Sequence, residues 1–249
     1  MVEDELSPID YLFTLRGRER EAFHTIIDSV NTFLAQENSA TERLVDILRI
    51  EQSINSALQE HDPELIDAIK HVIAQILEDD ASLALLAEKL NDYKDRVIAA
   101  TMLGWFRSRA KEVIPDLIDL AGWPGNATEA AKQAILLIGH AESEVMSALR
   151  KSVLDSDDGG FRELWDLAVR AGYSSLLEFQ DIVRMAVQSR NPHLREAAAD
   201  AIWRLDTADK QRFASILDLL KNDPYEHVRL VHLQPDFDKR SFCAKLQKK

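Results

Sequence analysis

Cysteine, glycine and proline are all scarce in this sequence of 249 residues. The single cysteine, Cys243, excludes an intrachain disulfide and fits a reducing compartment. Eight glycines and seven prolines leave little material for the many turns of an all-β protein. No apolar run approaches the roughly 18 residues of a membrane span, and no apolar signal segment follows the acidic N-terminus. We therefore expect a cytoplasmic protein that does not enter membranes.

Positive charge is also in short supply, since 30 Lys and Arg face 43 Asp and Glu for a net charge of −13 at pH 7. Residues 235–249 carry a net charge of +3, which leaves −16 on the preceding part of the chain. Nucleic acids and anionic membranes require clustered positive charge, so the composition argues against both as partners. A basic protein would be attracted to such a surface. Charge that only keeps the protein soluble is the alternative.

Ala, Leu, Glu, Asp, Ile and Arg dominate the sequence, which favours helix. In the N-terminal third of the chain apolar side chains recur at intervals of three and four, as on a helix with one buried face. Ser39–Glu42 matches the capping box of a helix N-terminus. The pattern predicts helices over the apolar runs Ile9–Leu34 (with a division near Gly17), Leu44–Leu58, Leu65–Ile76 and Leu83–Leu90.

A short cassette recurs later in the chain, and its clearest copy is Asn191–Trp203. Asn191 suits a helix N-cap, and Pro192 suits the first helical turn, where a missing N–H costs nothing. Second helices are expected between the cassettes, at 112–121, 142–154, 175–188 and 209–221. The cassettes recur at intervals of 32–34 residues. Helical hairpins that repeat at a nearly constant interval of this length are typical of an α-solenoid, in which the stacking of neighbouring hairpins forms the core. The equivalent reference positions of the successive copies are Arg96, Thr128, Arg162, Arg195 and Arg229.

These cassettes resemble the HEAT repeat. The pattern Leu-Leu-x-Asp-Pro-x-x-x-Val-Arg is clearest in Leu219–Arg229, with an Ala-rich form in Asn191–Ala199 and a weaker one in Asp92–Ala100. Pro115 lies where the first helices of such repeats often carry a kinking proline. The resemblance covers roughly residues 80–232 and implies an all-α fold, a right-handed α-solenoid of about six or seven HEAT-like helical hairpins.

The resemblance further implies that the recurring arginine bonds to the adjacent turn, typically to an aspartate. An anion-binding stripe of arginines is the alternative. We expect one continuous solenoid, with a helical N-terminal cap (1–80), HEAT-like repeats (81–234) and a basic C-terminal segment (235–249). Aspartates placed for the structural role are Asp92, Asp157, Asp158 and Asp223.

Signals of enzymatic chemistry are weak. Asp157–Gly160 lacks the Lys-Ser/Thr of a phosphate-binding loop, no Gly-x-Ser-x-Gly elbow is present, and Cys243 lies in a terminal segment. HEAT-like proteins include alkylpurine DNA glycosylases and bilin lyases as well as scaffold subunits, and these remain alternatives. The glycosylases use concave tryptophans in a basic groove, which this acidic chain lacks. We therefore expect core or rim packing for Trp105, Trp123, Trp165 and Trp203.

The seven histidines show no familiar metal-binding spacing. None forms His-x-x-x-His or His-Glu-x-x-His, and a single cysteine does not favour a structural zinc site. We expect neither a metal nor another cofactor. The histidines are His24, His61, His71, His140, His193, His227 and His232.

Acidic residues of the cassette helices form the most suggestive binding set. A glutamate directly after the reference site recurs in three copies, and an aspartate lies one turn further on in two. Repetition would align them in a column on the inner, concave surface. Glutamate near a helix start is also favoured by the helix dipole, so a solvated surface is the alternative. The predicted partner-binding residues are Glu129, Glu163, Asp166, Glu196, Asp200 and Trp203.

The function expected from these features is non-catalytic. HEAT arrays mostly present a curved surface to another macromolecule, and this one is acidic. We therefore expect a protein-binding module that binds or inhibits a basic protein, as an adaptor, an inhibitor or an immunity-type protein does.

Overall fold

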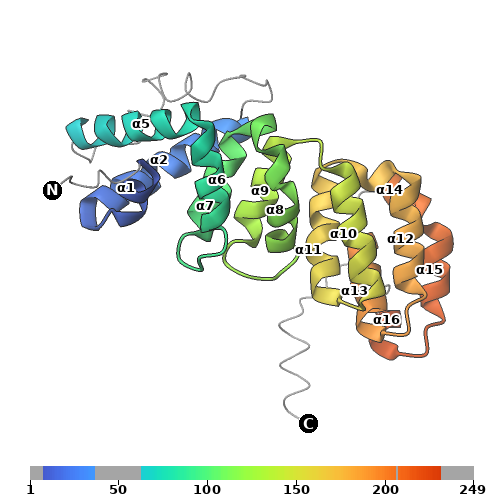
Figure 1. Ribbon diagram of the computed structural model, residues 1–249. Coiled ribbons are helices and arrows are strands. Elements are labelled where there is room, and N and C mark those ends of the chain that lie inside the picture. The colour runs from blue at the N-terminus through green and yellow to red at the C-terminus, as the bar shows by residue number, and fades with distance from the viewer. Residues whose placement is uncertain (1–7, 37–62, 206, 231–249) are drawn as a thin grey trace, which may run out of the picture. The chain divides into compact units, whose positions relative to one another are not determined.

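The computed structural model describes residues 8–36, 63–205 and 207–230, and every regular element in these ranges is a helix (Figure 1). The all-α class expected from the composition is confirmed for this part of the chain. None of its helices has the length and apolarity that crossing a membrane requires. The expected helix 44–58 with its capping box, the basic segment 235–249 and Cys243 lie outside the described residues.

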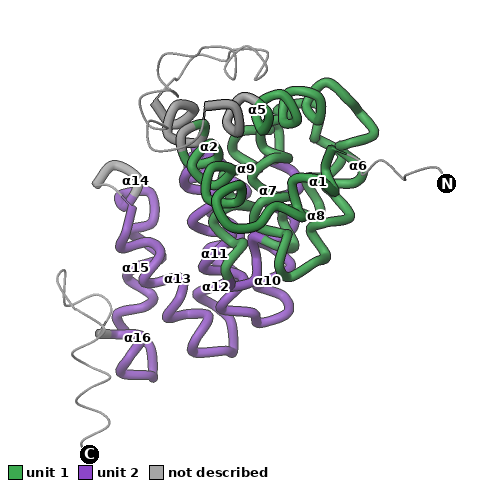
Figure 2. The backbone as a smooth tube through the Cα atoms, turned by 90° about the vertical axis from the view of Figure 1, so that its left-hand side faces the viewer, with its two compact units in different colours: residues 1–120, 126–141 green, residues 121–125, 142–249 purple. Residues whose placement is uncertain are grey.

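The chain forms two compact units (Figure 2). The first unit contains residues 1–120 and 126–141, and the second contains residues 121–125 and 142–249. The expected repeat block 81–234 therefore contributes to both units.

The first unit is built from helices that begin at Pro8 and end at Ile138. Between its first two helices Gly17 has a φ of +56°, a conformation that glycine adopts without steric cost, and the predicted division is confirmed there. The helices are α1 (Pro8–Thr14), α2 (Gly17–Gln36), α5 (Pro63–Glu78), α6 (Asp80–Lys89), α7 (Arg96–Trp105), α8 (Ile114–Ala121, its last residue assigned to the other unit) and α9 (Thr128–Ile138), with the 3₁₀ segment η1 (Arg107–Val113) before α8.

Packing in the first unit joins helices that lie far apart in the sequence. Helix α1 packs on α5 and α6, α2 packs on α5, and α7 packs along α9. Phe23, Ile26, Ile69 and Ile73 are fully buried, as the three- and four-residue spacing predicts.

The contact between α7 and α9 is unusually close at Gly104. A Cβ placed on this glycine would lie 2.8 Å from the Cα of Ala134 and 3.3 Å from its Cβ. Ala131 and Ala134 are buried on the same face of α9. Small residues on both helices therefore allow the backbones to approach.

The second unit is a stack of helical hairpins. Three helices pack side by side in one layer, α11 with α13 and α13 with α16, and the other layer places α12 between α10 and α15. The hairpin pairs are α10 with α11, α12 with α13, and α15 with α16. The elements are α10 (Glu142–Leu154), α11 (Asp158–Arg170), the 3₁₀ turn η2 (Tyr173–Ser175), α12 (Leu177–Val187), α13 (Pro192–Arg204), α14 (Thr207–Arg212), α15 (Ala214–Lys221) and α16 (Glu226–Leu230).

The predicted second helices agree with the structure to different degrees. The range 142–154 coincides with α10, whereas the range 209–221 is interrupted at Phe213 between α14 and α15. The range 112–121 begins as the 3₁₀ segment η1, so Pro115 lies in the first turn of α8. A proline in a first turn interrupts no helical hydrogen bond, and no kink is required of it there.

Trp165 lies three residues after its reference site, where three other cassettes have alanine (Ala99, Ala131 and Ala198). Its side chain is 4% exposed, and its ring lies 5.8 Å from that of Phe161, 4.6 Å from Phe179 and 6.3 Å from Phe213. Such aromatic contacts add about 0.5–1.5 kcal/mol per pair beyond the burial of area. An aromatic cluster thus fills the space between the layers of the second unit.

The close approach of α7 and α9 predicts that Gly104→Ala destabilises the first unit, although alanine is the better helix former. Because the new methyl group would press on the α9 backbone, we expect the free energy of unfolding to fall by about 1–3 kcal/mol in urea denaturation. Gly159→Ala is the matched control, since its Cβ would meet only Asp157 Oδ1 at 3.6 Å, and a gain of up to about 1 kcal/mol is expected. Equal stabilities of the two variants would contradict the close contact.

Candidate functional site

A buried ion pair joins the last two cassette helices. The Arg195 guanidinium donates to both carboxylate oxygens of Asp223, from Nε at 2.6 Å and from Nη2 at 3.1 Å. Both side chains are less than a tenth exposed. Asp223 also accepts a hydrogen bond from the Tyr225 amide at 2.9 Å, and the Tyr225 ring centre lies 5.3 Å from the guanidinium. These bonds fix the turn before α16 against α13.

The same two cassettes share a local arginine contact. Arg195 Nη1 donates to the Ser189 carbonyl at 2.8 Å, six residues upstream. Arg229, the equivalent residue of α16, donates to the Asp223 carbonyl, also six residues upstream. Each arginine therefore closes the turn that precedes its own helix. The structural role predicted for the recurring arginine is confirmed for Arg195, and its partner Asp223 is one of the four aspartates predicted for that role.

Arg96 and Arg162 reach other partners. Arg96 donates to the Asn126 side-chain oxygen, from Nε at 3.2 Å and Nη2 at 2.8 Å, and thus bonds to the turn before α9. Arg162 donates to Asp200 on α13 at 3.0 Å. Both contacts link one cassette to the next, but through different groups from those expected.

The aspartates predicted as arginine partners in these cassettes instead lie in local turns and at a helix start, where two of them accept hydrogen bonds from nearby backbone amides. Asp157 is the N-cap of α11 and accepts from the Gly160 amide at 2.9 Å, and Asp158 is the first residue of that helix. Asp92 accepts from the Lys94 amide at 2.9 Å. Side-chain oxygens of aspartate stabilise helix starts and turns in this way.

The environment of Asp223 favours its charged form. Burial alone would raise the pKa of this carboxyl, but the hydrogen bonds from Arg195 and the Tyr225 amide, with the charge of Arg195, outweigh burial. The pKa of Asp223 is therefore held below its ordinary value. Ionised Asp223 is thus the form that maintains the pair at neutral pH.

Two aspartates of the predicted binding set already have arginine partners. Asp200 accepts from Arg162 and from Arg204, both at 3.0 Å, and its side chain is 19% exposed. Asp166 pairs with Arg170 at 3.0 Å, one turn along α11. An incoming basic group would have to share these carboxylates with the protein's own cations.

The remaining members of that set lie in different surroundings. Glu129 is exposed on α9 in the first unit and accepts from Gln133 at 3.3 Å. Glu163 is half-buried on α11, in the second unit. Trp203 is half-buried at the end of α13, with the Lys210 ammonium 5.2 Å from its ring centre. Glu196 belongs to a separate cluster.

The acidic excess of the chain is concentrated before the second unit's hairpins. Residues 1–141 hold 25 acidic and 13 basic side chains, a net charge of −12, whereas residues 142–234 hold 16 and 12, a net charge of −4. Exposed acidic side chains of the first unit include Asp116 and Asp119 on α8. The segment that holds α11 and α13 therefore carries the smaller share of the acidic excess.

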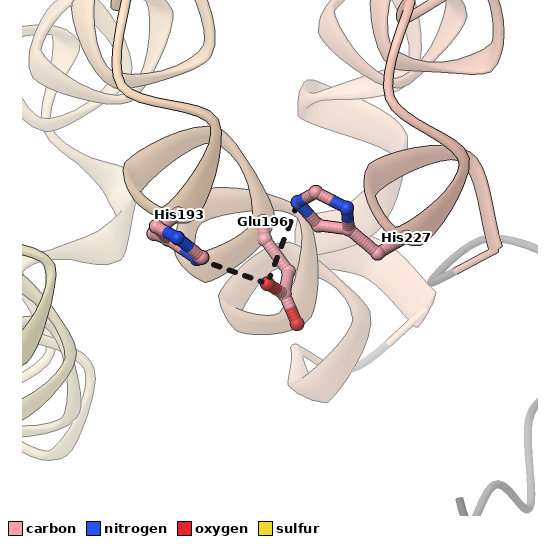
Figure 3. A group of neighbouring side chains, drawn as sticks. All are labelled: His193, Glu196 and His227. Atoms are coloured by element: carbon pink, nitrogen blue, oxygen red, sulfur yellow. Dashed lines mark ion pairs between the residues drawn. The ribbon is translucent and has the colours of Figure 1, made fainter. Parts of the chain in front are cut away.

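His193, Glu196 and His227 come together where α13 meets α16. His193 Nδ1 lies 3.9 Å and His227 Nε2 lies 4.0 Å from the same oxygen, Glu196 Oε2. One donor atom from each residue lies within 4.8 Å of the other two. Figure 3 shows the carboxylate reaching between the two rings, whose centres are 5.9 Å apart with planes 26° from parallel. The three side chains supply the donor types of a transition-metal site.

The repeat explains how this cluster forms. His193 and His227 are the second residues of α13 and α16, so they occupy the same position in two consecutive copies of the cassette. Stacked hairpins bring equivalent positions side by side, so two distant histidines become neighbours, and Glu196 lies one turn along α13. Spacing within a single helix cannot reveal such a pair. The available signal was the same residue at the same position in consecutive copies.

The tryptophans divide between the core and the surface. Trp105 and Trp165 are 2% and 4% exposed, so core packing is confirmed for both. Trp203 is half-buried, and Trp123 is 75% exposed. Trp105 and Trp165 are therefore unavailable to stack on a ligand.

Comparisons with protein-family models, with curated proteins and with solved structures found no match.

The buried pair predicts a large and pH-dependent effect of Asp223→Asn. At neutral pH the variant leaves Arg195 buried and unpaired, and we expect the free energy of unfolding of the second unit to fall by about 3–5 kcal/mol. Because the folded pKa is lowered, the stabilisation is complete above the unfolded pKa of about 4 and is lost as pH falls through the folded value. Urea denaturation at several pH values measures both effects.

The control for this prediction is Asp218→Asn on neighbouring α15. Asp218 pairs with Lys221 at 2.6 Å, but both side chains are mostly exposed, so a loss of no more than about 1 kcal/mol is expected. Similar losses in both variants, or a deficit of Asp223→Asn that stays constant below pH 4, would contradict the role of the buried pair.

Proposed function

We propose that this protein is a non-catalytic binding module, a right-handed α-solenoid of HEAT-like hairpins, which binds a basic protein through acidic side chains of its cassette helices. The stacked hairpins of the second unit support this class. In such a stack the residues at one surface position of successive repeats form a row, which a partner can contact along its length. The arginine contacts from one cassette to the next also support it.

The layer formed by α11, α13 and α16 carries the proposal. Its helices lie side by side, and Glu163 and Asp166 on α11 are partly accessible, as are Glu196 and Asp200 on α13. Carboxylates held at fixed places by packed helices lose little conformational entropy when a partner binds. The layer can therefore present several acceptors to one basic surface.

The ion pairs that these carboxylates already form within the protein determine what they would contribute to binding a partner. Asp166 and Asp200 already neutralise arginines, so exchanging one cation for another brings little net affinity. The gain lies instead in specificity and in the rate of encounter, to which the whole acidic chain contributes. Half-buried Trp203, at the end of α13, offers an aromatic contact of the kind that dominates interface energies.

The proposal predicts a salt-sensitive complex with a basic protein. A partner captured from the native host with the full chain is purified, and its dissociation constant is measured at about 50 and about 300 mM salt, concentrations between which screening changes strongly. We expect weaker binding at the higher concentration. We also expect Glu163→Gln combined with Asp166→Asn to weaken binding by up to about tenfold, mainly through slower association.

The matched control is Asp116→Asn combined with Asp119→Asn, which removes the same charge from the exposed surface of α8. This pair should slow association slightly and leave the dissociation rate unchanged. Unchanged affinity of the α11 variant, or equal effects of both variants, would contradict binding through the cassette helices.

A further inference from the structure

The geometry points to a zinc site formed by His193, Glu196 and His227, which joins α13 to α16 in the second unit. Two imidazoles and one carboxylate make a donor set that zinc favours, whereas calcium and magnesium prefer oxygen ligands only. The three residues come from two helices of the same unit. A bound ion would therefore connect two consecutive repeats.

The distances suit an ion better than they suit direct hydrogen bonds. The separations of 3.9 and 4.0 Å between imidazole nitrogens and Glu196 Oε2 exceed the range of a hydrogen bond. Ligand atoms of a tetrahedral zinc site with bonds of 2.0–2.2 Å lie about 3.4 Å apart. A closure of about half an ångström would bring each imidazole nitrogen to that spacing from Glu196 Oε2, and the two nitrogens, within 4.8 Å of each other, need a closure of up to about 1.4 Å.

An unsatisfied atom gives an independent sign of a missing ligand. His227 Nε2 is buried and has no hydrogen-bond partner among the described residues. This nitrogen lies 4.0 Å from Glu196 Oε2. Buried polar atoms are nearly always satisfied by protein, water or an ion, so such an exception requires an explanation. Coordination of His227 Nε2 to a metal supplies one.

The surrounding structure holds the ligands in place. The Tyr225 ring centre lies 5.7 Å from that of His227, and the Tyr225 amide is bonded to Asp223, the partner of Arg195. The buried pair thus fixes the start of α16, and with it His227, relative to α13. Support of this kind is what raises the affinity of a metal site.

The three ligand side chains are partly exposed to solvent, and this determines how a bound ion would behave. The side chains of His193, Glu196 and His227 are 68%, 28% and 37% exposed, so water would occupy the remaining coordination position. Three protein ligands and a water leave the site open to exchange. We assign it the role of a reversible clip between the last two repeats.

The test is zinc binding to the purified full chain, produced without a histidine tag and stripped of metal with a chelator. Competition with a chromophoric chelator should show one zinc ion per chain with micromolar or tighter affinity. Cobalt in place of zinc should give the visible absorption of a tetrahedral ion. Zinc should also raise the melting temperature, because it binds the folded state.

Single variants locate the site. His193→Ala and His227→Ala should each weaken zinc binding by at least about tenfold, since even loss of a supporting residue costs that much. They should also abolish the zinc-dependent shift in melting temperature. Glu196→Gln should weaken binding while keeping the shape of the side chain. His71→Ala, at an exposed histidine of the first unit that contacts Gln75, is the control and should bind zinc like the wild type.

Each outcome decides for or against the site. Loss of binding in the two histidine variants, with a normal control, supports it. Absence of saturable zinc binding, or wild-type affinity in both histidine variants, overturns it. Circular dichroism of each variant confirms that the helices remain folded. Neither histidine belongs to the acidic pair tested for partner binding, so the two proposals can fail separately.

Discussion

The end of the second unit depends on the buried ion pair between Arg195 and Asp223. Within the described residues helix α16 spans Glu226–Leu230, and a helical segment this short is stable only through its contacts, here with α13 and α15. A buried ion pair stabilises the fold only when both partners are present, because either partner alone would be a buried, unpaired charge. Here both carboxylate oxygens and the Tyr225 amide take part, and the pair therefore specifies where α16 lies.

The same repeat that builds this frame creates its variable surface. Equivalent positions lie side by side in consecutive hairpins. The arginine position therefore makes recurring structural contacts, whereas the residue type at neighbouring surface positions can differ from one copy to the next. Two positions before the arginine, the column contains His193 and His227 in the last two copies but Gly160 in the copy before them. A binding feature can thus be confined to one end of a repeated structure.

Prediction from sequence succeeds where local chemistry decides. Asn191 caps α13 and Gly17 divides two helices because each residue type suits that backbone conformation. It fails where packing decides: the break at Phe213 follows from burial of that ring against Trp165 and Phe179. The candidate site is harder still, since Asp200 reaches an arginine 38 residues away and the histidine cluster depends on the register between hairpins.

Arg195 and Asp223 hold α16 against α13. Hydrogen exchange of the backbone amides, compared between the wild type and Asp223→Asn at neutral pH, tests this role most directly, because exchange reports local opening. We expect faster exchange in α16 and in the first turns of α13, with unchanged exchange in α7 and α9 of the first unit. Unchanged protection of α16 in the variant would contradict this role.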